Sequence, residues 1–79
     1  MRVHVRLFAG LNRYVTNKPS GIPFDAELPD GATVEALIRH LGLPPDEVRV
    51  VFVNGRAQPL NFALTEGDEV GIFPPIGGG

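Results

Sequence analysis

The chain has no cysteine and no tryptophan, a single lysine (Lys18), and no long run of apolar residues. Without cysteine it can form no disulfide, bind no metal through thiolates and offer no sulfur nucleophile of its own. No apolar stretch approaches the roughly 20 residues that cross a bilayer. The first eight residues alternate basic with apolar side chains, which is unlike a secretory signal. We therefore expect a cytoplasmic protein that does not associate with membranes.

The charged residues are few and nearly balanced, with a formal net charge of −2 at pH 7. A chain without a basic surface is not expected to have nucleic acid as its primary partner. The two histidines, His4 and His40, have no neighbouring ligands at metal-site spacing, so no metal site is expected. Asp68 and Glu69 follow a glycine and are interpreted as solvated turn charges. At 79 residues, the chain is expected to be one small domain spanning residues 1–79.

Two stretches in the first third of the chain have the alternation of strands. Val3, Val5 and Leu7 alternate with basic residues, which predicts a first strand with one buried face. Apolar residues alternate again over 22–28, where Pro23 favours a position at the edge of a sheet. A short helical turn over 11–15 and a loop precede the second strand. The two strands are predicted to form a hairpin with a long connection.

One helix is predicted after the turn at residues 29–31. Thr33 is a suitable N-cap, and apolar residues recur at helical spacing from Val34 to Leu41. Gly42 suits the left-handed position that ends a helix, Leu43 can pack back on the helix, and Pro44 prevents its continuation.

The second half of the chain returns to strand patterns. The run at 48–53 is β-branched and aromatic and ends at Asn54-Gly55, a strong hairpin signal. Residues 56–60 are predicted to return beside it, and a last strand is predicted at 70–73, with Phe62 and Leu64 filling the core between them. The result is an α+β roll, with a four- to five-stranded mixed sheet and one main helix on one face.

The end of the chain, residues 73–79, cannot contribute to a packed fold. Pro74 and Pro75 lack the backbone N–H groups that a sheet needs, and the glycines at 77–79 have no side chain to pack. Such a flexible extended tail can instead offer its backbone and its terminal carboxylate to another protein.

This order of elements resembles the β-grasp, ubiquitin-like sulfur carriers, and within them the small subunits of molybdopterin synthases; the thiazole-pathway sulfur carriers are related. The resemblance covers nearly the whole chain. It is carried by Arg6-Leu7-Phe8-Ala9, Thr33-Val34, Val53-Asn54-Gly55, Glu66-Gly67-Asp68-Glu69-Val70 and the tail from Phe73-Pro74-Pro75 to Gly79. The chain departs from the family at Leu11-Asn12-Arg13, where Leu-Arg-Glu is frequent, and in having a third terminal glycine.

The resemblance implies a sulfur donor subunit without an active site of its own. Gly79 would be the reactive residue: its carboxyl group is adenylated and then converted to a thiocarboxylate, with Gly78 as its essential neighbour and Gly77 at a position where a small residue is tolerated. No cofactor would be bound, since ATP is used in trans by a ubiquitin-activating-type adenylyltransferase. The second partner would be the large subunit of a molybdopterin synthase in a heterotetramer, with a cyclic pyranopterin phosphate as sulfur acceptor.

A tail of this kind needs a body that also docks. Counting strand parity, we expect Phe8, Val51, Val53 and Phe73 on the face that the helix leaves uncovered, with Arg6 and Arg49 at its rim. The tail residues Pro74, Pro75, Ile76 and Gly77 would complete the partner-binding surface as a stiffened stalk.

Other functions stay open at this point. The chain could carry sulfur for thiamine thiazole or for tRNA thiolation, or it could be a ubiquitin-like protein modifier. It could also be a β-grasp binding module whose tail is incidental.

Overall fold

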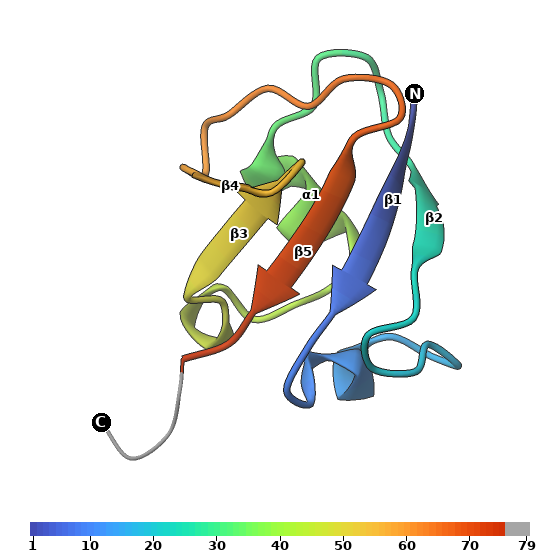
Figure 1. Cartoon of the computed structure of the whole chain (residues 1–79), viewed down its shortest axis with the longest axis vertical. Coiled ribbons are helices and arrows are strands. Elements are labelled where there is room, and N and C mark those ends of the chain that lie inside the picture. Colours follow the sequence, from blue (N-terminus) through green and yellow to red (C-terminus); the bar gives the residue numbers. More distant parts are fainter. Residues whose placement is uncertain (76–79) are drawn as a thin grey trace.

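The computed structural model describes residues 1–75. Its strands are β1 (Arg2–Leu7), β2 (Phe24–Glu27), β3 (Val50–Val53), β4 (Arg56–Gln58) and β5 (Glu69–Phe73). The helical elements are α1 (Val34–His40) and two 3₁₀ turns, η1 (Leu11–Tyr14) and η2 (Pro45–Glu47). The strands form one five-stranded sheet in the order β2-β1-β5-β3-β4, with α1 against one face (Figure 1).

The sheet is mixed, because β1 and β5 run parallel while every other pair of neighbours is antiparallel. The predicted hairpin of the first two strands is confirmed, and β2 forms one edge of the sheet. β2 begins only at Phe24, so the prediction of a strand from residue 22 was too long. Pro23 cannot donate to a ladder, and Ile22 is 55% exposed.

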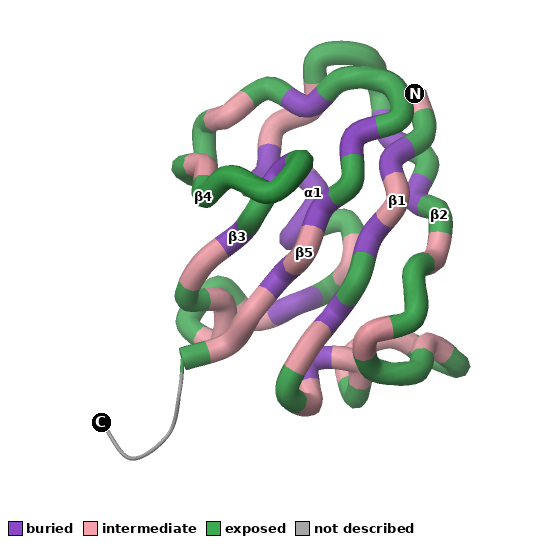
Figure 2. The backbone as a smooth tube through the Cα atoms, in the orientation of Figure 1, coloured by how far each residue is buried: buried purple, intermediate pink, exposed green. Residues whose placement is uncertain are grey.

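The core lies between α1 and the sheet. Val3, Val5 and Leu7 of β1 are fully buried, as their alternation predicts, and β1 and β5 alternate in burial along their lengths (Figure 2). The helix contributes Val34, Leu37 and Ile38. Burial of each such side chain stabilises the fold by about 1.5–3 kcal/mol relative to exposure.

The ends of α1 are the ones that the sequence predicts. The Thr33 hydroxyl accepts a hydrogen bond from the Ala36 N–H at 3.2 Å. At the other end Gly42 has φ +73°, and the Leu43 N–H donates to the Ile38 carbonyl at 3.1 Å. This is a Schellman ending, which satisfies carbonyl groups that the helix itself leaves without donors.

The predicted orientation of β3 is wrong. Val51 and Val53 are each only 3% exposed and belong to the core, whereas Phe52 between them is 36% exposed. The cause is the pairing with β5, which sets Val51 opposite Ile72 and Phe52 opposite Gly71. The outer, uncovered face of β3 therefore carries Val50 and Phe52.

No helix within residues 1–75 has the length and apolar character needed to cross a membrane.

Candidate docking face and tail base

The chain leaves the body at the end of β5, between β1 and β3 (Figure 1). Two backbone hydrogen bonds hold this end: the Arg49 N–H donates to the Phe73 carbonyl at 2.8 Å, and the Phe8 N–H donates to the Ile72 carbonyl at 3.1 Å. Pro74 and Pro75 follow directly. The predicted roles of Ile76, Gly77, Gly78 and Gly79 lie outside the described residues and stay predictions.

Three phenylalanines, Phe8, Phe52 and Phe73, form an aromatic cluster on the outer face at the base of the tail. The rings of Phe8 and Phe73 are stacked, with centroids 4.4 Å apart and planes 5° from parallel. Phe52 meets Phe73 edge to face, with centroids 5.6 Å apart and an interplanar angle of 84°. Offset-stacked and edge-to-face pairs of this kind add stabilisation beyond the area that they bury.

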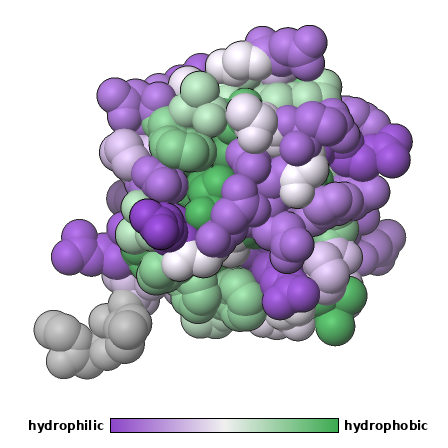
Figure 3. Space-filling view, turned by 45° about the horizontal axis from the view of Figure 1, so that its top comes forward, coloured by the Kyte–Doolittle hydropathy of each residue, from purple (hydrophilic) through white to green (hydrophobic). Residues whose placement is uncertain are grey.

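The sequence predicts the outer position of Phe8 and Phe73, and the structure confirms that these rings lie together outside the core. Phe52 was missed. The run at 50–53 is apolar at every position, so the strand itself does not indicate which parity faces outward. The side of the molecule shown in Figure 3 exposes hydrophobic residues among hydrophilic ones.

A hollow of about 560 Å³ adjoins the cluster at the base of the tail. Phe52, Phe73, Pro74 and Pro75 line its apolar part, and charged side chains line the rest: Arg13, Glu47 and Arg49. Arg13 lies 3.5 Å from the Glu47 carboxylate, which also accepts a hydrogen bond from the Tyr14 hydroxyl at 3.3 Å. These contacts join η1 to η2 beside the point where the tail begins.

The outer face beyond the cluster is charged. On β1, Arg2 pairs with Glu27 at 2.9 Å, and His4 Nδ1 lies 2.6 Å from the Asp25 carboxylate. The hydrogen bond with Glu27 is the main cause that raises the pKa of Arg2, and the charges of Glu27 and Asp25 act in the same direction.

Asp68 is buried, at 7% exposure, so the interpretation as a solvated turn charge is wrong. Its carboxylate accepts hydrogen bonds from the Thr65 N–H at 2.8 Å, the Asn54 side-chain amide at 2.9 Å and the Thr65 hydroxyl at 3.0 Å. Burial alone would raise the pKa of Asp68, but these hydrogen bonds outweigh that effect and lower it. The carboxylate thus fastens the β3–β4 hairpin to the start of β5.

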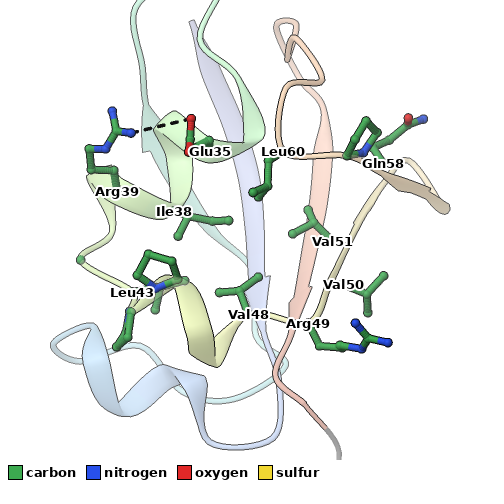
Figure 4. Close-up of a pocket in the computed structure, with 14 residues that line it drawn as sticks. Glu35, Ile38, Arg39, Leu43, Val48, Arg49, Val50, Val51, Gln58 and Leu60 are labelled. Atoms are coloured by element: carbon green, nitrogen blue, oxygen red, sulfur yellow. Dashed lines mark ion pairs between the residues drawn. The ribbon is translucent and has the colours of Figure 1, made fainter.

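A separate cleft of about 540 Å³ lies on the helix side of the sheet, between α1 and β3. Figure 4 shows Ile38, Val51 and Leu60 converging in it, with Glu35 and Arg39 paired at its rim at 3.7 Å. Its walls are mainly apolar, and it meets the tail-base hollow only at Arg49 and Val50. Residues 1–75 hold no group of three His, Asp or Glu side chains that could bind a metal ion.

Comparison with known proteins covers both the body and the tail. The sequence profile of the ThiS family matches residues 5–79. The molybdopterin synthase sulfur carrier subunit of Haemophilus influenzae is 36% identical over 58 residues, which are 63% of this chain and 72% of that protein.

Two solved structures show the same fold. Small archaeal modifier protein 1 of Haloferax volcanii superposes with a TM-score of 0.72 at 26% identity, over 95% of this chain and 98% of that one. A chain in the complex of subunits 1 and 2 of the molybdopterin-converting factor from Helicobacter pylori superposes with a TM-score of 0.63 at 21% identity, over the whole of both chains. The five-stranded mixed sheet with one helix is a ubiquitin-like β-grasp fold, as predicted. With a profile match that extends over almost its whole length, this chain belongs to the ThiS family of sulfur carriers.

Proposed function

We propose that this chain carries sulfur on the carboxyl group of Gly79, as the small subunit of a cytoplasmic molybdopterin synthase. The match to the ThiS family extends through the terminal glycines, and the Haemophilus influenzae relative is a sulfur carrier subunit of this kind. The observation that carries the proposal is the aromatic cluster. It offers a docking surface at the base of the tail, and the tail would bear the reactive carboxyl group.

The chemistry begins with activation of a carboxylate. An α-carboxyl group has a pKa of roughly 3.3 to 3.7, so at neutral pH the Gly79 carboxylate is an anion and a poor electrophile. An adenylyltransferase supplies ATP, a carboxylate oxygen attacks the α-phosphorus, and pyrophosphate leaves. A hydrosulfide equivalent then attacks the carbonyl carbon of the acyl adenylate and AMP leaves, which yields the thiocarboxylate. The sulfur comes from a separate donor, because this chain has no cysteine.

The thiocarboxylate then acts as the sulfur nucleophile in the active site of the large subunit. The Helicobacter pylori complex, in which subunits 1 and 2 of a converting factor associate, supports a large-subunit partner. Glycines suit this delivery, since a narrow channel can accept a backbone without side chains. Pro74 and Pro75 restrict the stalk between the body and the glycines, which lowers the entropy that insertion costs.

The test is a loading reaction with the purified chain, ATP, sulfide and the adenylyltransferase of the same organism. We expect the intact mass to change by the replacement of one oxygen by one sulfur, located on the C-terminal peptide. A chain that lacks Gly78 and Gly79 is the control and should stay unchanged. An unaltered mass for the full chain, under conditions in which the enzyme forms an adenylate with a known carrier, would contradict the proposal.

A second function is favoured by one observation, the likeness to small archaeal modifier protein 1. A modifier would be joined through Gly79 to lysine side chains of other proteins. Isopeptide-linked adducts of the tagged chain in cell extracts would support this function, and recovery of the free chain alone would exclude it.

A further inference from the structure

One cation on the outer face lacks the partner that its neighbours have. Arg2, His4 and Arg6 alternate along β1, and β2 supplies a carboxylate opposite the first two, Glu27 and Asp25. Because Val5 pairs with Phe24, the next position along β2 toward Arg6 is Pro23, which has no charge. Within residues 1–75, Arg6 is exposed and makes no ion pair.

A hollow of about 340 Å³ lies beside Arg6 on the outer face. Its floor is Gly71, which sits opposite Arg6 in the parallel pairing of β1 with β5 and opposite Phe52 in the antiparallel pairing with β3. The walls are apolar toward the tail, where Phe8, Phe52 and Phe73 stand, and more polar at the far end: His4 and Glu69. We call this feature the Gly71 hollow.

The hollow exists because residue 71 has no side chain. A Cβ there would lie 3.4 Å from one carbon of the Phe8 ring and 3.6 Å from one carbon of the Phe73 ring. A glycine in the interior of a strand weakens the strand and often marks a site of close approach by a ligand or another chain. The rings therefore stand beside a floor without a side chain, which leaves room for a side chain of another protein.

We propose that the Gly71 hollow receives one bulky apolar side chain from a loop of the synthase large subunit, and that a carboxylate next to that side chain pairs with Arg6. This inference rests on the function proposed above and names the chemistry of the partner at that docking face. Aromatic residues and arginine are the side chains that most often dominate protein interfaces. The hollow is near the lower end of the volumes of small-molecule sites and lies on an open sheet face, which suits a side chain better than an enclosed ligand.

Charge fixes the orientation of the partner loop. The carboxylate must lie against Arg6, on the β1 side of the hollow, and away from the His4 end, where Glu69 would repel it. An apolar side chain alone would leave Arg6 without a counter-charge at the edge of a buried contact, which is unfavourable. An apolar side chain next to a carboxylate therefore provides a contact for the aromatic rings and a counter-charge for Arg6.

The test measures the affinity of the purified large subunit from the same organism for the full chain, by calorimetry at low and high salt. We expect Arg6→Gln to weaken binding by about 10-fold and to flatten the salt dependence, and Arg6→Glu to weaken it by about 100-fold. Arg2→Gln is the matched control, since Arg2 lies on the same strand and face but is already paired. It should stay within about twofold of the unaltered chain.

Gly71→Ala tests the apolar half of the hollow separately. It should weaken binding by about 10-fold while the salt dependence persists, because the added methyl group occupies the floor but leaves Arg6 in place. The inference would be overturned if Arg6→Glu and Gly71→Ala left the affinity for the large subunit unchanged. It would also be overturned if Arg2→Gln and Arg6→Gln lowered that affinity equally. Neither result would affect the proposed loading reaction at Gly79. If the unaltered chain fails to bind the large subunit at all, the assignment of that partner falls and this inference falls with it.

Discussion

Val51 and Phe52 are adjacent along β3 but face opposite sides of the sheet, and they should respond differently to truncation. Val51→Ala removes a side chain that is 3% exposed, so we expect a loss of about 1.5–3 kcal/mol in the free energy of unfolding, with little effect on partner affinity. Phe52→Ala should lose less stability but weaken binding of the large subunit by at least about 10-fold. Urea denaturation and calorimetry measure the two effects. A larger loss of stability for Phe52→Ala than for Val51→Ala would contradict the assignment of the two faces.

Asp68 should make the stability of the protein depend on pH in the acidic range. Its pKa is lowered in the folded state, so the carboxylate contributes stability that is fully present above the ordinary pKa of 3.8 and is lost as the pH falls through the lower, folded value. We expect Asp68→Asn to cost about 2 kcal/mol of unfolding free energy near neutral pH. The difference from the unaltered protein should shrink below about pH 3.8.

Urea denaturation at neutral pH and at about pH 3 measures this linkage. Glu69→Gln is the control, because Glu69 is the exposed neighbour of Asp68 and its carboxylate makes no hydrogen bond within residues 1–75. A constant difference between Asp68→Asn and the unaltered chain at both pH values would show that the carboxylate is not stabilised by its partners in the fold.

At the scale of elements, α1 is short, with seven residues, and depends on its ends. The Thr33 hydroxyl is the N-cap, so Thr33→Ala should lower the free energy of unfolding by about 1 kcal/mol. Thr33→Ser keeps the hydroxyl and should retain most of the stability. Thermal or chemical denaturation of the three proteins checks this, and equal stability for Thr33→Ala and the unaltered chain would show that the cap contributes nothing.

The elements differ in how well the sequence predicts them. The helix ends were predictable because a cap and a C-terminal glycine act locally, and β1 was predictable because its polar and apolar residues alternate. The four residues of β3, Val50–Val53, are all apolar, so either parity satisfies the pattern and only pairing with Gly71 and Ile72 of β5 decides which face is buried. That pairing is a tertiary contact, which no local pattern in the strand itself contains.

Asp68 illustrates the same limit at the hairpin. Asn54-Gly55 and Glu66-Gly67-Asp68 were each correctly interpreted as turns, yet the two turns are joined by a hydrogen bond between residues 14 apart in the chain. The burial of Asp68 follows from this meeting of two turns. Composition predicts each turn, whereas the contact between them depends on β3 and β5 being neighbours in the sheet.

At the scale of the whole molecule, the proposed function gives the body and the tail separate tasks. Ordering a chain segment costs about 1–2 kcal/mol per residue, so placing a four-residue tail in a partner's active site would cost several kcal/mol. Burial of one apolar side chain at the interface contributes about 1.5–3 kcal/mol to binding, which does not offset the cost of ordering the tail. A cluster of three rings with a nearby cation offers more, and this is why docking should depend on the outer face of the body rather than on the tail alone.

This division of tasks predicts the effect of deleting Gly78 and Gly79. Because the buried core of residues 1–75 runs from Val3 to Ile72, we expect the midpoint of thermal unfolding to stay unchanged. The affinity for the large subunit should fall by less than about 10-fold, since the aromatic cluster and Arg6 remain. Sulfur loading and molybdenum cofactor synthesis should be abolished, because the carboxylate is withdrawn by roughly 7 Å from its place in the activating enzyme.

Phe52→Ala in the full chain is the complementary control, because it keeps the reactive carboxylate and weakens the contact of the body. Thermal denaturation, calorimetry and intact mass after the loading reaction separate the three properties. If the truncated chain still supports cofactor synthesis in cells, the tail is not the sulfur carrier, and the outer face is left as the binding surface of a module with another function.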